Sequence, residues 1–318
     1  MLHGTLCLAK ARRSRPLNPE AQTRMTHAHH AAIESFWVSA ALILAALVYL
    51  RGWLLVRKLE ADGAKVRHAG SFLAGLFLIW LAIASPLAAL DHELLTAHMV
   101  QHLLLMTIAP PLIFLGAPAK PLLYGLGQTV AQIIARPFRA QRFQRLWSAL
   151  MNPAVCWLGA AGTLVIWHIP SVFMLGLRSE YWHGVEQISF LGAGLLFWWP
   201  VVQPSPSSLK WPELSILLYL FLATLPCDVL SGFLVFCDRV VYPAYFSSPR
   251  IFQFSALEDQ QCAGALMWTC VTIVFLIAGT IFTARLLSPR FSEEPSILPS
   301  EARSIAVPRT AGQSMGAV

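Results

Sequence analysis

Two histidines and a methionine follow one another at intervals of four residues in an apolar stretch of the chain. His98, His102 and Met106 are spaced so that, in a helix, their side chains lie above one another on a single face. The flanking residues are mostly Leu, Ile and Ala, which are typical of a helix in a lipid bilayer. Ionisable side chains are costly there, so they indicate either a functional site or hydrogen bonds that join neighbouring helices. We expect a functional site.

The composition of the 318-residue chain is that of a membrane protein. Hydrophobic residues make up 56% of the chain and charged residues only 12%, whereas about a quarter of an average soluble domain is charged. The mean hydropathy is +0.60. Several apolar runs approach the roughly 20 residues that a transmembrane helix needs. Basic cytoplasmic loops explain the net charge of +7, so the charge does not indicate a nucleic-acid partner.

We predict an all-α membrane protein, a bundle of seven transmembrane helices embedded in the lipid bilayer. The predicted spans are residues 34–56, 70–90, 94–117, 154–177, 183–203, 213–237 and 260–286. Residues 1–33 are predicted to form a disordered polar extension, and residues 287–318 a disordered cytoplasmic tail. The first 24 residues are either a dispensable extension or precede the true start of the protein.

The basic residues lie on one side of this arrangement. Lys and Arg concentrate in the connections after the first, third, fifth and seventh spans, whereas the opposite connections hold only Arg178, Arg239 and Arg250. By the positive-inside rule, the N-terminus is periplasmic and the C-terminus cytoplasmic. The basic segment before residue 24 opposes this orientation, which is a further reason to doubt that it belongs to the mature protein.

Polar residues of several spans then fall at one depth near the periplasmic surface. At 1.5 Å per residue, His102 lies roughly 12 Å inside the outer end of its span, and His168 and Asp228 lie at roughly 13 Å. Met267 falls at a comparable level. The predicted metal ligands are His98, His102, Met106, His168, His183, Glu186, Asp228 and Asp259. Imidazole, thioether and carboxylate together favour copper over zinc or iron, and a carboxylate can also orient an imidazole that binds the metal.

Structural roles compete with ligation at several of these positions. His183 and Glu186, three residues apart, are also suited to a hydrogen-bonded pair. Asp228 is suited to a structural pair with Arg239 or with a histidine. A methionine in an apolar run is more often a packing residue than a ligand.

Short motifs carry these residues in a consistent order over about residues 34–286. They are His98-Met-Val-Gln-His102, Trp167-His168-Ile-Pro170, His183-Gly-Val-Glu186, Phe197-Trp-Trp-Pro200, Tyr242-Pro-Ala-Tyr245 and Asp259-Gln260-Gln-Cys-Ala-Gly264-Ala-Leu-Met267-Trp268. Together they resemble the multi-spanning CtaG family of cytochrome c oxidase assembly factors, the caa3-type kind.

The resemblance implies a multi-pass protein of the bacterial inner (plasma) membrane that helps to assemble haem-copper oxidase. It implies copper as the cargo, handled or delivered for the CuB centre, and a haem-copper oxidase subunit or a periplasmic copper chaperone as the partner. No enzymatic activity is implied. One position departs from the family pattern, which has a second histidine after Glu186 where this chain has Gln187. Because glutamine is a poor copper ligand, Gln187 would contact a ligand rather than the metal, or the metal affinity of the site would be lower.

Two other functions stay open at this point. A copper permease of the CopD-like kind would pass the metal inward, but the inner halves of the spans offer few ligands beyond Cys156. A haem-binding redox protein would use histidines of different helices as axial ligands. The six cysteines include no C-x-x-C pair, and Cys227, Cys237 and Cys262 are candidates for a soft metal ligand or a disulfide.

Overall fold

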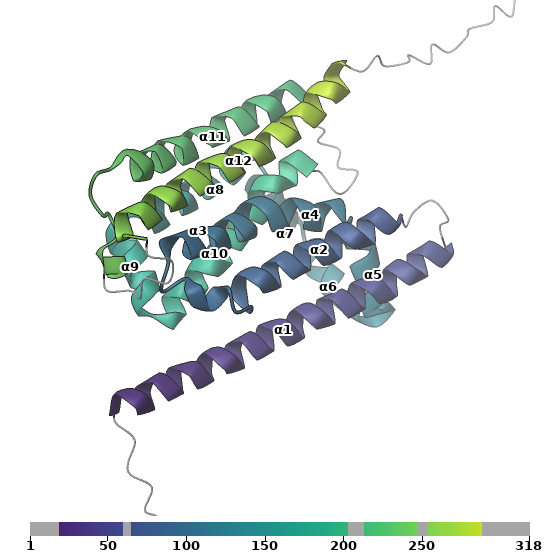
Figure 1. The fold of residues 1–318 in the computed structure, drawn as a ribbon. Coiled ribbons are helices and arrows are strands. Elements are labelled where there is room, and N and C mark those ends of the chain that lie inside the picture. Colours follow the sequence, from purple (N-terminus) through teal and green to yellow (C-terminus); the bar gives the residue numbers. More distant parts are fainter. Residues whose placement is uncertain (1–18, 60–64, 203–212, 247–253, 288–318) are drawn as a thin grey trace, which may run out of the picture. The chain divides into compact units, whose positions relative to one another are not determined.

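The computed structural model of the protein describes residues 19–59, 65–202, 213–246 and 254–287, and these residues form helices and connections without strands (Figure 1). The longest helices are α1 (Pro19–Leu59), α2 (Val66–Ile83), α10 (Glu180–Val202), α11 (Glu213–Phe236) and α12 (Ala256–Leu287). The shorter elements are η1 (Ala88–Leu90), α3 (Leu95–Leu103), η2 (Leu104–Ile108), α4 (Ala109–Leu115), α5 (Ala119–Leu126), α6 (Gln128–Phe138), α7 (Gln141–Leu150), α8 (Pro153–His168), α9 (Pro170–Arg178) and η3 (Pro243–Phe246).

The number of helices that can cross a membrane agrees with an all-α bundle of six or seven spans. Six helical segments of the described ranges are long and apolar enough, and a seventh crossing results if α7 and α8, which meet at 62°, count as one span. The predicted span 154–177 is divided in the structure between α8 and α9. Ile169 between them is extended, with φ −65° and ψ 124°, because the ring of Pro170 disfavours helical geometry at the preceding residue.

Helix α1 is longer than the predicted first span. It begins at Pro19, so residues 19–33, predicted as part of a disordered extension, are helical here. Proline is favoured at the first position of a helix, and the sequence has no further Pro or Gly before Gly52 to interrupt it. Residues 1–18 and 288–318 lie outside the described ranges, so the prediction for the two ends of the chain stays a prediction.

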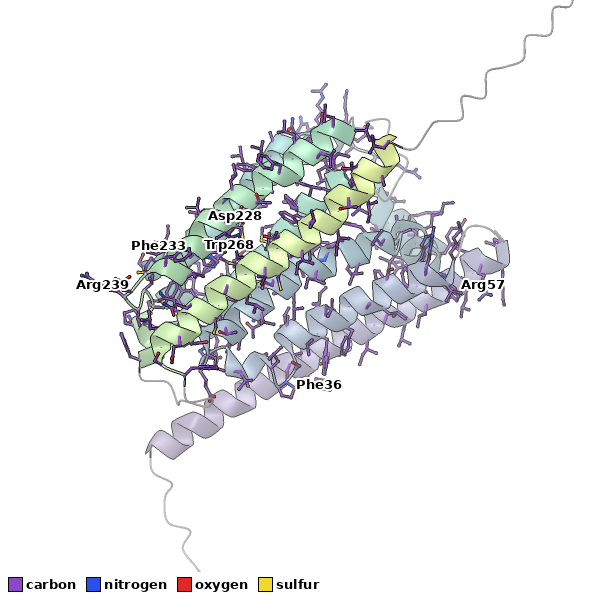
Figure 2. The ribbon with its side chains drawn as sticks, turned by 45° about the horizontal axis from the view of Figure 1, so that its top comes forward. Phe36, Arg57, Asp228, Phe233, Arg239 and Trp268 are labelled. Carbon is purple, nitrogen blue, oxygen red and sulfur yellow. The ribbon has the colours of Figure 1, made fainter. Side chains whose placement is uncertain are left out.

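Large apolar side chains cover the outside of the bundle, as expected for a surface in contact with lipid. Phe36 on α1 is 62% exposed and Phe233 on α11 is 54% exposed (Figure 2). Arg57, near the end of α1, lies at one end of the helices, and Arg239, which follows α11, lies at the other (Figure 2). The bundle is therefore apolar around its sides and charged at its ends.

The span that carries the paired histidines is not a uniform helix. Between α3 and α4 the chain widens into the π-helical turn η2, in which the amide of Ala109 bonds to the carbonyl of Leu104. Pro110 has no N–H to donate to the carbonyl of Met106, and the indole of Trp198 on α10 donates to that oxygen instead, at 3.2 Å. Proline and a π-turn are common causes of such irregularity, and π-turns are frequent at functional sites.

Candidate metal centre

Two histidines of α3 and a glutamate of α10 converge inside the bundle. His98 and Glu186 are 0% exposed and His102 is 5% exposed. Nε2 of each histidine lies 3.4 Å from Oε1 of Glu186. One ligand atom from each of the three residues fits within 4.8 Å of the others, a spacing that suits one metal ion. We call these three residues the buried group.

Several polar atoms of the buried group have no hydrogen-bond partner. They are Nδ1 of His98, both ring nitrogens of His102, and Oε2 of Glu186. Native proteins pair nearly all buried polar atoms, and an unpaired one costs about 1–3 kcal/mol. The remaining contact, between Nε2 of His98 and Oε1 of Glu186, is a hydrogen bond within the group. Imidazole and carboxylate groups that converge and keep unpaired atoms are what a metal-binding site presents before its ion is bound.

His168 reaches the same region from the end of α8. Its Nδ1 lies 2.7 Å from the carbonyl of Leu164, which can only accept, so Nδ1 carries the proton in the neutral ring. Nε2 is then a free lone pair, and it is buried without a partner. The ring centroids of His168 and His102 are 6.4 Å apart.

A tyrosine of the connection between α11 and α12 fixes the break that follows His168. The hydroxyl of Tyr242 donates to the carbonyl of His168 at 2.9 Å, where the break between α8 and α9 frees that oxygen. Burial raises the pKa of Tyr242, and the nearby charge of Glu186 raises it further. The phenol therefore stays protonated and remains a hydrogen-bond donor.

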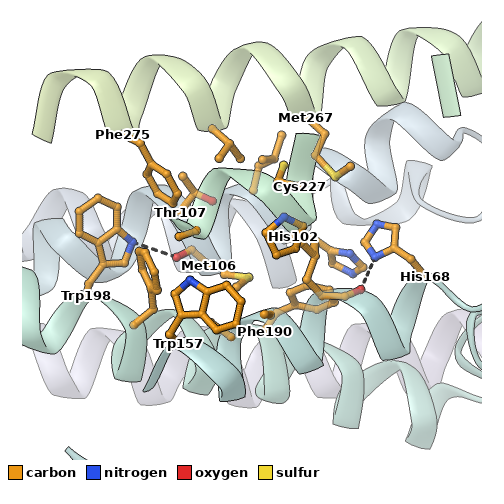
Figure 3. Close-up of a pocket in the computed structure, with 18 of the residues that line it drawn as sticks. His102, Met106, Thr107, Trp157, His168, Phe190, Trp198, Cys227, Met267 and Phe275 are labelled. Carbon is orange, nitrogen blue, oxygen red and sulfur yellow. Dashed lines mark hydrogen bonds between the residues drawn. The ribbon is translucent and has the colours of Figure 1, made fainter. Parts of the chain in front are cut away.

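His102 and His168 line one cavity of about 60 Å³ (Figure 3). Sulfur atoms supply much of the remaining chemistry of its wall, which includes Met99, Met106, Cys227 and Met267. Aromatic rings close it, among them Phe190, which stacks on His102 with ring centroids 3.9 Å apart. The volume of the cavity is sufficient for a few water molecules or one ion beside imidazole and thioether groups.

A second set of candidate ligands adjoins the buried group. Asp91, which follows η1, lies with Oδ2 3.2 Å from Nε2 of His183 and with Oδ1 3.7 Å from Nε2 of His92. The ligand atoms of these three residues also fit within 4.8 Å of one another. We call them the outer group. Gln187, the position that departs from the family pattern, has its Nε2 3.3 Å from Nε2 of His183.

Four of the predicted ligands join neither group. Met106 and His168 line the cavity beside His102, whereas Asp228 and Asp259 do not. Asp259 at the start of α12 accepts hydrogen bonds from the amides of Leu95 and Thr96, at 2.7 and 3.1 Å, and from the Thr96 hydroxyl. It therefore caps the N-terminus of α3, a role that satisfies its carboxylate. Asp228 is half-buried on α11, beside the buried Cys227, and belongs to neither set of clustered ligands among the described residues (Figure 2).

The sequence reasoning missed Asp91, which is only 2% exposed. Its place directly before His92, in a connection, was the one available signal, and a carboxylate in a connection is usually solvated. The predicted disulfide alternative finds no support in the described part of the chain, where Cys156, Cys227, Cys237, Cys262 and Cys270 are all free.

Comparison with known proteins gives one family and several distant relatives. The family model described as cytochrome c oxidase caa3 assembly factor (Caa3_CtaG) matches residues 47–289. The chain is 24% identical over 256 residues to uncharacterized proteins of Mycobacterium bovis and Mycobacterium tuberculosis, and 21% identical over 252 residues to one of Mycobacterium leprae. These matches cover 77%, 77% and 76% of this chain but only 38%, 38% and 37% of the relatives. No solved structure matches the chain.

Proposed function

Because the chain belongs to the cytochrome c oxidase caa3 assembly factor family, we propose that it handles copper in the buried group and delivers it for the CuB centre of the oxidase. One observation carries this proposal: two buried imidazoles of α3 and a buried carboxylate of α10 converge, and four of their side-chain nitrogen and oxygen atoms have no hydrogen-bond partner. Membrane-buried ionisable groups are costly, so their convergence favours a functional role over a structural one.

The donor set supports copper as the cargo. Imidazole suits copper, zinc and iron, whereas the thioethers of Met106 and Met267 near His102 and His168 favour copper. The cavity between these histidines, at about 60 Å³, is far below the roughly 300–1,000 Å³ of typical small-molecule and cofactor pockets. Its size therefore favours a metal ion over haem.

The charges at the two ends of the bundle support a periplasm-facing site in the bacterial inner membrane. The last turn of α1 and the segment from α5 to α7 carry the basic residues Arg57, Lys58, Lys120, Arg136, Arg139, Arg142 and Arg145. The start of α3 lies at the Arg239 end, because Asp259 caps α3 at Leu95 and its neighbour Gln260 donates to the carbonyl of Arg239 at 3.2 Å. His98 on α3 and Asp91 just before it place the two sets of ligands toward that end. By the positive-inside rule the basic end is cytoplasmic. A phosphatase fused after Leu287 is expected to stay inactive, and an active fusion contradicts this orientation.

Delivery at the periplasmic face is favoured over passage through the membrane. In the part of the chain that the structure describes, both groups of three metal-ligating side chains lie at the same end. A permease needs ligands that continue to the other side. We infer that the copper leaves the way it entered, toward a haem-copper oxidase subunit, after arriving from a periplasmic copper chaperone, and that the protein itself is not an enzyme.

The test is the metal content of the oxidase made in cells that carry His98→Ala or His102→Ala. We expect each variant to reach the membrane in normal amount and to yield oxidase that contains haem but lacks copper at CuB. His68→Ala, which changes a histidine at the start of α2, is the matched control. Full copper content in oxidase from both variants contradicts the proposal.

A further inference from the structure

The outer group repeats the donor types of the buried group at a more accessible position. Each set offers two imidazoles and one carboxylate. The side chain of His92 is 53% exposed, that of His183 is 14% exposed and that of Asp91 is 2% exposed. The buried group is closed, whereas the outer group has one ligand that reaches solvent.

The carboxylate of Asp91 is held in place with one oxygen unpaired. Oδ2 accepts from Nε2 of Gln101 at 3.2 Å and lies 3.2 Å from His183. Oδ1 is buried, lies 3.7 Å from Nε2 of His92 and makes no hydrogen bond. The hydroxyl of Tyr245 donates to the backbone carbonyl of Asp91 at 2.9 Å. Burial raises the pKa of this phenol, and the charge of Asp91 raises it further, so the hydroxyl stays a donor. A fixed carboxylate whose two oxygens each face an imidazole, one of them without a hydrogen bond, is preorganised for a cation.

His183 connects the two groups. Its ring lies parallel to that of His98, with centroids 5.7 Å apart and an interplanar angle of 26°. The ring centroid of His92 also lies 5.7 Å from that of His183. His183 and Glu186 are three residues apart on α10, so they lie one turn apart on neighbouring faces of one helix. A metal ion held by the outer group is thus adjacent to the buried group.

We propose that Asp91, His92 and His183 form a second copper(II) site, which receives the ion at the periplasmic face and passes it to the buried group. The inference rests on the proposed function of the buried group. The ion exchanges imidazole and carboxylate ligands for others of the same kind, so the step needs no change of oxidation state. Two divalent cations at adjacent positions repel each other, so we expect one copper ion per protein, held at one position or the other.

The test compares copper bound by four purified full-length proteins in detergent after loading with copper(II) and removal of the excess. They are the wild type, His92→Ala, the double variant His98→Ala/His102→Ala, and the triple variant that combines all three changes. We expect one copper ion in each of the first three and none in the triple variant. His92 is exposed, so its replacement is not expected to disturb folding, and His68→Ala added to the double variant is the matched control for His92→Ala.

The outcomes separate the two proposals. If the wild type binds copper and the double variant binds none, the outer site is refuted while the buried site stands. If the triple variant still binds copper, the copper of the double variant is not held by His92, and this outcome also refutes the outer site. If His92→Ala alone abolishes binding and the double variant does not, the buried site fails and the outer site stands. The rate of loading gives a second measurement: we expect His92→Ala to slow copper uptake by the buried group at least tenfold, and an unchanged rate contradicts the transfer step.

Discussion

Gly176 on α9 determines the space available to the carboxylate of the buried group. A Cβ added at Gly176 would lie 2.6 Å from Oε2 of Glu186 and 3.5 Å from its Cδ, with Trp167 3.7 Å away. Glu186 is fully buried, so it has no solvent-filled space into which to move. Relieving the contact to an ordinary separation of about 3.5 Å requires a shift of roughly 0.5–1 Å. The substitution Gly176→Ala therefore moves a proposed ligand without removing it.

We expect this shift to weaken copper binding substantially. Metal sites tolerate misplacements of only about 0.5 Å, and changes in the residues that orient ligands typically cost about 10–100-fold in metal affinity. We expect Gly176→Ala to lower the affinity for copper by about that factor. Replacing a helical glycine by alanine stabilises the helix by about 0.5–1 kcal/mol, whereas overpacking of a buried site costs about 1–3 kcal/mol. Thermal unfolding of Gly176→Ala therefore accompanies the affinity measurement, so that a weaker site is distinguished from loss of folding.

The assay is competition for copper(II) against a chromophoric chelator, in the His92→Ala background so that only the buried group binds. Gly192→Ala on α10 is the matched control, because a Cβ there meets no atom within 4 Å. Glu186→Asp, which shortens the side chain by one methylene, is expected to restore part of the affinity when combined with Gly176→Ala. An affinity for Gly176→Ala equal to that of the control refutes the role assigned to Glu186.

Three further changes test the elements that position the site. Tyr242→Phe leaves a buried carbonyl at the α8–α9 break unpaired, so we expect a loss of about 1–3 kcal/mol of stability in thermal unfolding. The control Tyr181→Phe, at a residue 73% exposed, should have no effect. Equal melting temperatures for the two variants contradict this role of Tyr242. Gly194→Ala places a Cβ 2.6 Å from the carbonyl oxygen of Met106 in the π-turn, so we expect less of this variant to accumulate in membranes. Gly232→Ala, whose Cβ meets no atom within 4 Å, is the control and should accumulate normally. Normal accumulation of Gly194→Ala refutes close packing between α10 and the π-turn. Asp259→Ala removes the cap of α3 and should lower the free energy of unfolding by about 0.5–2 kcal/mol. We expect its copper affinity to stay unchanged, whereas weaker copper binding would indicate that Asp259 is a ligand.

Helical periodicity predicted part of the site from the sequence. Periodicity alone put His98 and His102 on one face, and the two lie there with Glu186. The depth of His168 was also informative, since it lines the same cavity as His102. Rotation about the helix axis, in contrast, depends on which neighbours pack against each face. For this reason Asp228, predicted at the same depth, lies outside both groups.

Contacts between distant segments account for the other differences. Asp259 caps a helix that begins 164 residues earlier in the chain, and no local pattern identifies that partner. Asp91 is buried because Tyr245 and Gln101 reach it from elsewhere in the fold. The π-turn beneath His102 depends on Pro110 together with the indole of Trp198, of which the sequence shows only the proline.

The most direct test of the central claim is the electron paramagnetic resonance spectrum of copper(II) bound to the His92→Ala protein. Our account predicts nitrogen hyperfine splitting from at least two imidazoles, because His98 and His102 face one position with Glu186. It also predicts that this signal disappears when His98→Ala and His102→Ala are added. A copper signal without imidazole splitting, or one that survives both substitutions, contradicts it.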